Sequence, residues 1–232
     1  RAGIDTEEID LVIAATASGD YIGFPATASI VQDRLGLKKT GAFDLVAGCT
    51  GFVYGLETAR SMLAAGAHRN VLLIGVEVLS KVTNWEDRNT CVLFGDGAGA
   101  VVLSKTESEE SGIFDSILRS EGSGAEHLMR QAGGSREPVE ETTPKEHLYV
   151  HMNGRQVYNF AVRVNTEIIS ELFERNDIGI DDIKKIVPHQ ANIRIIQAAA
   201  KRLSLPMEKF FVNIEEYANT SAASIPIALN EL

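Results

Sequence analysis

Residues 42–65 read AFDLVAGCTGFVYGLETARSMLAA, and they give the clearest indication of the chain's architecture. The apolar run Ala42–Val46 has the length of a buried strand, whereas Thr50–Ala65 has the length and the small residues of a helix. Only a short turn that contains Cys49 separates them. A strand that leads directly into a helix predicts an α/β fold.

The same alternation continues on both sides of this segment. Leu11–Ala15 and Val71–Val76 are strand-like runs, and Pro25–Leu35 is helix-like, with Pro25 suited to a first helical turn. Gly36 and Gly66 suit the left-handed residues at which helices commonly end. The pattern therefore predicts strands and helices in alternation.

A polar segment, 105–147, follows and is rich in Glu, Ser and Gly. We expect it to be a surface loop between two halves, with Ile113–Leu118 as its one strand candidate. After it, Asn192–Leu203 is expected to form a helix that ends before Pro206.

Short sequence words recur in the two parts of the chain. Gly3-Ile4-Asp5 reappears as Gly179-Ile180-Asp181, and in each part an apolar run later leads into a helix of small residues. These repeats predict two duplicated halves, residues 1–111 and 112–232, each incomplete.

Composition restricts the class of protein. The chain has 232 residues, 44% of them hydrophobic, which is enough for a sizeable core. Its net charge of -10 argues against nucleic acid as the main partner, and no apolar run approaches the roughly 20 residues that cross a membrane. Because the chain opens on Arg1 without an initiator Met and stops at Leu232 inside an apparent helix, we expect a fragment.

The two cysteines, Cys49 and Cys91, have neither disulfide nor metal-ligand spacing, so we expect a reducing, cytoplasmic compartment and no metal site. Cys49 stands between a strand and a helix, where free N–H groups and the helix dipole stabilise a thiolate. The alternative is a small core cysteine, which Cys91 fits better.

His189 and Asn219 also stand where a strand gives way to a helix. His189 follows the apolar pair Ile186–Val187, at the carboxyl end where site residues of α/β folds lie, although a structural histidine is equally consistent. Asn219 matches Cys49 in the duplication, although helix capping would explain it. The three side chains suit a nucleophile with hydrogen-bond donors around a carbonyl oxygen.

The glycine cluster Gly95–Ala100 formally fits a nucleotide-binding fingerprint. Such a loop must open a helix, whereas this cluster runs into the strand-like Val101–Leu103. We expect close packing instead, which leaves a dinucleotide-dependent oxidoreductase as the least supported class.

Together, four segments in this order resemble bacterial 3-oxoacyl-(acyl-carrier-protein) synthase III of the thiolase superfamily. They are Gly48–Phe52, Phe94–Ala100, Pro188–Asn192 and Asn219–Ser224. The resemblance implies a layered αβαβα fold of two duplicated halves, here truncated at both ends.

The resemblance also implies a reaction. Cys49 would attack an acyl-CoA, and His189 and Asn219 would stabilise the enolate formed when malonyl-acyl-carrier protein loses carbon dioxide. The product would be a 3-oxoacyl-acyl-carrier protein, which initiates fatty acid biosynthesis. The CoA thioester is a substrate, so no cofactor is expected.

Further positions follow from the same resemblance. Arg88 and Asn192 would lie along the path of the CoA, and Phe24 would line the acyl pocket across the interface of a homodimer. The acyl-carrier protein, an acidic partner, would dock on a basic helix face, which a merely solvated face explains equally well; its residues are Arg194, Lys201 and Arg202.

Other members of the superfamily remain open. A degradative thiolase would need a second catalytic cysteine, and residues 112–232 contain none. A polyketide-type synthase, a hydroxymethylglutaryl-CoA synthase and a non-catalytic ketosynthase-like subunit stay as alternatives.

Overall fold

The computed structural model describes residues 2–108 and 110–232; Arg1, at which the chain opens, and Glu109, in the polar segment, lie outside it. The chain divides into two compact units. The first unit comprises Arg1–Val78, Asp96–Ser116 and Thr220–Leu232, and the second comprises Leu79–Gly95 and Ile117–Asn219. This division follows packing, whereas the halves 1–111 and 112–232 follow the repeat and stay a prediction.

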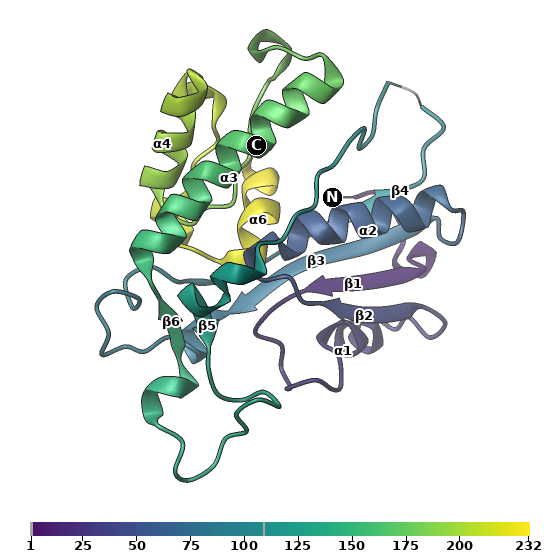
Figure 1. Cartoon of the computed structure of the whole chain (residues 1–232). Coiled ribbons are helices and arrows are strands. Elements are labelled where there is room, and N and C mark those ends of the chain that lie inside the picture. The colour runs from purple at the N-terminus through teal and green to yellow at the C-terminus, as the bar shows by residue number, and fades with distance from the viewer. Residues whose placement is uncertain (1, 109) are drawn as a thin grey trace. The chain divides into compact units, whose positions relative to one another are not determined.

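The first unit is built on a sheet of four strands in the order β2-β1-β3-β4 (Figure 1). β1 is parallel to β2 and β3, and β4 is antiparallel to β3. The strands are β1 (Leu11–Ala15), β2 (Gly41–Leu45), β3 (Asn70–Val78) and β4 (Asp96–Ser104). The expected α/β sheet is confirmed.

Both faces of β1 are covered, which explains its uninterrupted apolar sequence. Successive side chains of a strand point to opposite faces. Leu11 and Ile13 pack with α2 (Gly51–Ala64), whereas Val12 and Ala14 pack toward α1 (Thr27–Arg34). The core of the first unit therefore lies on both sides of one central strand.

α6 (Ser224–Glu231) completes the first unit by packing on β4. A Cβ atom on Gly99 would lie 2.9 Å from Pro226 and from the backbone nitrogen of Ile227. Gly97 is similarly close to Ile227. The expectation that the glycine cluster serves close packing is confirmed, because its glycines let α6 approach the strand.

The second unit contains one long and two shorter helices and a pair of short antiparallel strands. Its helices are α3 (Gly154–Asn176), α4 (Ile193–Leu203) and α5 (Ile214–Tyr217), and its paired strands are β5 (Leu128–Arg130) and β6 (Val150–Met152). α3 packs against α4. Ile196 and Ala200, on the buried face of α4, form a hydrophobic core with Phe210.

Eight short 3-10 turns link these elements. They are η1 (Thr6–Glu8), η2 (Gly48–Thr50), η3 (Leu79–Lys81), η4 (Gly122–His127), η5 (Lys145–Leu148), η6 (Ile180–Asp182), η7 (Met207–Lys209) and η8 (Ser221–Ala223), all within the described ranges. Among the described residues, no helix is both long enough and apolar enough to cross a bilayer.

Most predicted elements are confirmed to within a few residues, and Gly36 and Gly66 have the expected left-handed φ of 73° and 75°. Pro25 precedes α1 rather than lying in its first turn, because Ala26 is the N-cap. The strand predicted at Ile113–Leu118 is wrong. This segment is instead irregular, and Ser116 donates a hydrogen bond of 2.7 Å to Glu57 of α2.

The repeat is visible in local conformation. η1 and η6 each begin beside a backbone N–H that donates to a carboxylate three residues later, Asp5 to Glu8 at 3.1 Å and Gly179 to Asp182 at 2.8 Å. These matched turns support the duplicated fold.

η2 and η8 form a second matched pair, because each opens on a residue with positive φ, Gly48 at 53° and Ser221 at 49°. This pairing puts Cys49 opposite Ala222 in the repeat. The expectation that Cys49 and Asn219 occupy matching positions stays a prediction, and in this pairing Asn219 lies just before the turn that matches η2.

Candidate active site

Cys49 is the middle residue of η2, between the end of β2 and the start of α2. Gly48 before it has a φ of 53°, a conformation that favours glycine. The Thr50 hydroxyl donates to the carbonyl oxygen of Ala47 at 2.8 Å and closes the turn. The half-buried thiol thus lies at a helix N-terminus, the environment in which a thiolate is stabilised.

The start of α2 is held close to two neighbouring elements of the first unit. A Cβ atom on Gly51 would lie 3.2 Å from the Cβ of Ala15 and 3.5 Å from the Cβ of Ala222. η2 also packs directly against η8. The backbone around Cys49 is therefore fixed by the end of β1 and by η8.

Sequence reasoning missed Glu77, whose carboxylate is buried at the end of β3. It accepts hydrogen bonds from the backbone N–H of Ala17 at 3.2 Å and from the hydroxyl of Ser221 at 3.0 Å. Thr16 and Ser18 donate to it as well. The sequence could have revealed it, because Glu77 is the one acidic residue in an apolar strand and, by the alternation of side chains, it faces the core.

Asn219 lies in the second unit, and its backbone is held from both sides. Its N–H donates to the carbonyl of Leu93 at 2.9 Å, and its carbonyl accepts from Gly95 at 3.0 Å. A side chain on Gly95 would collide with the carbonyl of Tyr217, so glycine is required there. Thr220, and not Asn219, occupies the N-cap position of η8.

His189 also lies in the second unit, just after an isolated parallel bridge between Ile186 and Phe210. The next residue, Gln190, is 1% exposed and donates to the carbonyls of Pro188 at 3.0 Å and Phe211 at 3.1 Å. Gln190 therefore fixes the backbone from which the half-buried His189 extends.

The three residues predicted to bind substrate, Asn192, Phe24 and Arg88, differ in their surroundings. Asn192 is the N-cap of α4, where its side chain accepts from the Arg194 N–H at 2.9 Å, which gives it a structural role. Phe24 is 86% exposed. Arg88 is exposed and follows Asp87, whose pKa is lowered chiefly by a hydrogen bond from the Asn89 backbone.

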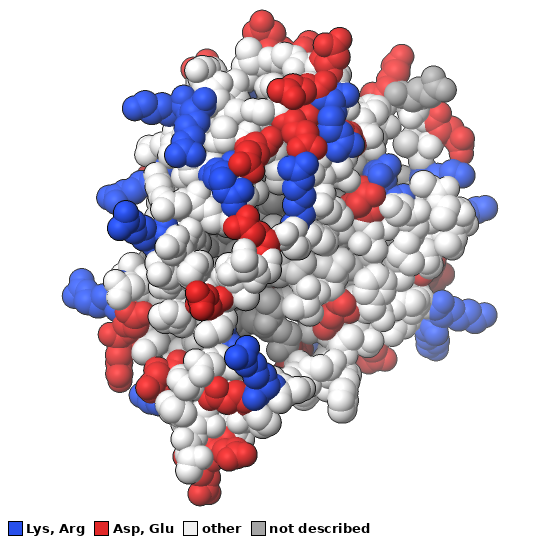
Figure 2. Space-filling view, viewed as in Figure 1, with Lys and Arg blue, Asp and Glu red and all other residues white. Residues whose placement is uncertain are grey.

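The three basic residues expected at a docking face, Arg194, Lys201 and Arg202, are exposed on α4. Figure 2 shows Lys and Arg side chains along the margin of the view where α4 lies in Figure 1, whereas acidic and basic side chains alternate over α3. A local basic surface thus exists on a chain whose net charge is -10.

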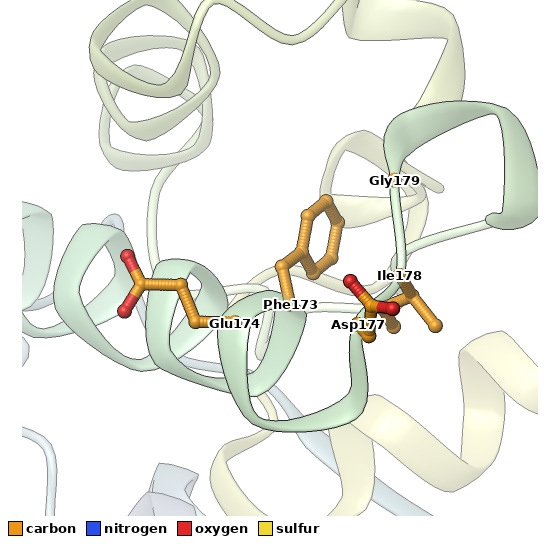
Figure 3. Close-up of a pocket in the computed structure, with 5 residues that line it drawn as sticks. All are labelled: Phe173, Glu174, Asp177, Ile178 and Gly179. Carbon is orange, nitrogen blue, oxygen red and sulfur yellow. The ribbon is translucent and has the colours of Figure 1, made fainter.

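A shallow hollow lies at the end of α3 and contains none of the predicted site residues (Figure 3). It is lined by Phe173, Glu174, Asp177, Ile178 and Gly179. Within the described ranges, no group of three or more His, Cys, Asp or Glu residues is arranged to hold a metal ion. The structure places Cys49 in the first unit and His189 and Asn219 in the second.

Comparison with protein families gives two matches. A model described as 3-oxoacyl-(acyl-carrier-protein) synthase III matches residues 43–122, and one described as the C terminal of the same synthase matches residues 173–232. The first segment includes Cys49, and the second includes His189 and Asn219.

Similar proteins of known name agree. The beta-ketoacyl-(acyl-carrier-protein) synthase III of Clostridium perfringens (strain SM101 / Type A) is 50% identical over 231 residues, which cover 100% of this chain and 71% of that protein. Its namesake from Symbiobacterium thermophilum is 51% identical and covers 100% and 70%. The crystal structure of 3-oxoacyl-(acyl-carrier-protein) synthase III from Aquifex aeolicus VF5 matches with a TM-score of 0.87 and 45% identity, covering 97% of this chain and 68% of that one.

Proposed function

Because the chain belongs to the 3-oxoacyl-(acyl-carrier-protein) synthase III family, we propose that Cys49 is the residue it acylates during the condensation that initiates fatty acid synthesis. The enzyme is a condensing acyltransferase. The observation that carries the proposed role is the position of Cys49 in a glycine-flanked turn at the N-terminus of α2.

In the first half-reaction, the Cys49 thiolate attacks the carbonyl carbon of an acyl-CoA. The tetrahedral oxyanion collapses, the C–S bond to CoA breaks, and CoA leaves as a thiolate. Backbone N–H groups at the start of α2 can donate to the oxyanion, because the first turn of a helix has N–H groups without partners in the helix.

In the second half-reaction, malonyl-acyl-carrier protein loses carbon dioxide, and the electron pair of the broken C–C bond forms a thioester enolate. His189 and Asn219 donate hydrogen bonds to the enolate oxygen, where negative charge develops. The enolate carbon then attacks the acyl-Cys49 carbonyl, and the Cys49 thiolate is released. Neither half-reaction takes electrons from, or gives electrons to, an outside donor or acceptor, so the reaction needs no redox cofactor.

The partners follow from the same proposal. The acyl-carrier protein brings the malonyl group, and the basic face of α4 is its docking surface. Two copies of the chain form a homodimer, in which the exposed Phe24 is covered by the second copy and lines its acyl pocket. Arg88 and Asn192 lie along the CoA path.

Intact-mass spectrometry of the complete protein after incubation with acetyl-CoA tests the role of Cys49. Wild type and Cys91→Ala should gain one acetyl group, and Cys49→Ala should gain none. His189→Ala and Asn219→Ala should still be acetylated, yet they should form the 3-oxoacyl product at least about 100-fold more slowly, as expected when donors to an oxyanion are removed. Absence of a wild-type adduct with any acyl-CoA would instead favour a non-catalytic ketosynthase-like subunit.

A further inference from the structure

Glu77 is a buried carboxylate that the proposed reaction does not use. Only 1% of it is exposed, and four donors surround it: the Ala17 backbone N–H and the hydroxyls of Thr16, Ser18 and Ser221. A buried carboxylate is unfavourable unless such donors compensate for lost hydration. Glu77 therefore joins the end of β1 and the loop after it to η8.

Ser221 is the donor that matters most for the site. It opens η8, is 4% exposed, and has a φ of 49°, a conformation unfavourable for residues other than glycine. The matching position in η2 is Gly48. A serine at the η8 position gives the turn a hydroxyl, and that hydroxyl donates to Glu77 at 3.0 Å.

The turn held by Ser221 lies against the start of α2. Gly75 and Glu77 are on the same buried face of β3, and a Cβ atom on Gly75 would collide with the carbonyl of Ala222. The Cβ of Ala222 in turn lies 3.5 Å from the position of a Cβ on Gly51, two residues after Cys49. A shift of η8 would therefore move the backbone around Cys49.

We infer that Glu77 is a positioning residue for Cys49, acting through Ser221 and η8 without touching substrate. This inference rests on the proposed role of Cys49 as the acylated residue. Displacement of a reacting group by about 1 Å can slow a reaction about 100-fold. Loss of the Glu77–Ser221 bond should thus slow the acylation of Cys49 more than it weakens the binding of acyl-CoA.

Three variants test this role. Glu77→Leu removes both carboxylate oxygens, so neither the Ser221 hydroxyl nor the Ala17 N–H, which is 3.2 Å from each oxygen, keeps its acceptor. Ser221→Ala removes the hydroxyl and keeps the Cβ at positive φ, whereas Ser221→Gly removes the hydroxyl and also relieves the backbone. If conformation alone mattered, Ser221→Gly would act like wild type.

The readout is the single-turnover rate of Cys49 acetylation by acetyl-CoA, measured well below each variant's unfolding temperature. All three variants should be slowed about tenfold or more at saturating acetyl-CoA, with the half-saturating concentration nearly unchanged. The double variant Glu77→Leu/Ser221→Ala should be no slower than the slower single variant, because both substitutions break the same bond.

Glu57→Leu is the matched control. Glu57 is a carboxylate of the same unit that also accepts from two hydroxyls, those of Ser61 and Ser116, and none of its hydrogen bonds described above reaches η8. It should lose stability and keep the wild-type acylation rate. A wild-type rate in folded Glu77→Leu, or equal slowing in Glu57→Leu, would overturn the inference.

The two proposals fail in different ways. If wild type is not acetylated, the assignment of Cys49 falls. If wild type is acetylated and the variants react at the same rate, only the positioning role of Glu77 falls. Should Glu77→Leu not fold, Ser221→Ala and Ser221→Gly decide the question by the same criteria.

Discussion

Glu57 shows how a single carboxylate on α2 is tied to its surroundings. Arg60 donates two hydrogen bonds of 2.7 Å to it, and Ser61 and Ser116 donate one each. The bonds from Arg60 contribute most to lowering the pKa of Glu57 from 4.5 to about 2. Its side chain is 18% exposed, so solvent screens these interactions only in part.

The lowered pKa predicts a pH-dependent stability. Ionised Glu57 stabilises the fold fully above about pH 5, and the contribution is lost as the pH falls toward the folded-state pKa of about 2. Glu57→Gln should therefore reduce the free energy of unfolding by about 1–2 kcal/mol at pH 7 and by progressively less at lower pH. Urea unfolding at pH 7, 4 and 3 measures the difference.

The exposed Glu7 provides the comparison, because Glu7→Gln removes the same charge without these hydrogen bonds. Its effect should be small at every pH. A wild-type advantage over Glu57→Gln that stays constant from pH 7 to pH 3 would contradict the explanation.

Single residues also show what the sequence could predict. Cys49 was found because a cysteine between a strand and a helix has a chemical reason to be there. Glu77 was not found, because its partners Ser18 and Ser221 are far from it along the chain. Only the folded chain brings those hydroxyls to one carboxylate.

Among the elements, the contact of α6 with β4 depends on the absence of side chains. Gly99→Ala should lower the free energy of unfolding by about 1–3 kcal/mol, because the new methyl group would lie 2.9 Å from Pro226 and Ile227. Chemical denaturation of the complete protein measures the change.

Gly122→Ala is the corresponding control, since no atom beyond its two chain neighbours lies within 4 Å of the position of its added Cβ. It should unfold at nearly the wild-type denaturant concentration. Equal stability of wild type and Gly99→Ala would show that α6 can move away from β4 without loss.

Strongly patterned elements were predictable, and weakly patterned ones were not. β1 matches its prediction because an apolar strand buried on both faces has a distinct sequence. Ile113–Leu118 is also largely apolar, but Asp115 and Ser116 interrupt it, and hydrogen bonding of Ser116 to α2 takes the place of strand pairing. Local sequence alone does not decide between strand pairing and an irregular conformation, because the choice depends on which elements the segment contacts in the folded chain.

For the whole molecule, the distribution of charge bears on partner binding. The chain has a net charge of -10, so an acidic carrier protein needs a local basic surface such as α4. Lys201→Glu should raise the half-saturating concentration of malonyl-acyl-carrier protein about three- to tenfold, because it replaces attraction with repulsion. Acetylation by acetyl-CoA should not change.

Steady-state kinetics at low and high salt would check this prediction. The difference between Lys201→Glu and wild type should shrink as salt screens the charges. Lys38→Glu makes the same charge change at an exposed position outside α4. Equal effects of the two substitutions would argue against docking on α4.

The return of Thr220–Leu232 to the first unit has a consequence for biosynthesis. The ribosome synthesises β1 to β4 well before α6. The face of β4 on which α6 packs therefore stays exposed until more than half of the chain has been added. Contacts between distant parts of a chain slow folding and leave apolar surface open meanwhile. We expect the nascent first unit to be protease-sensitive and to become resistant only once α6 has left the exit tunnel.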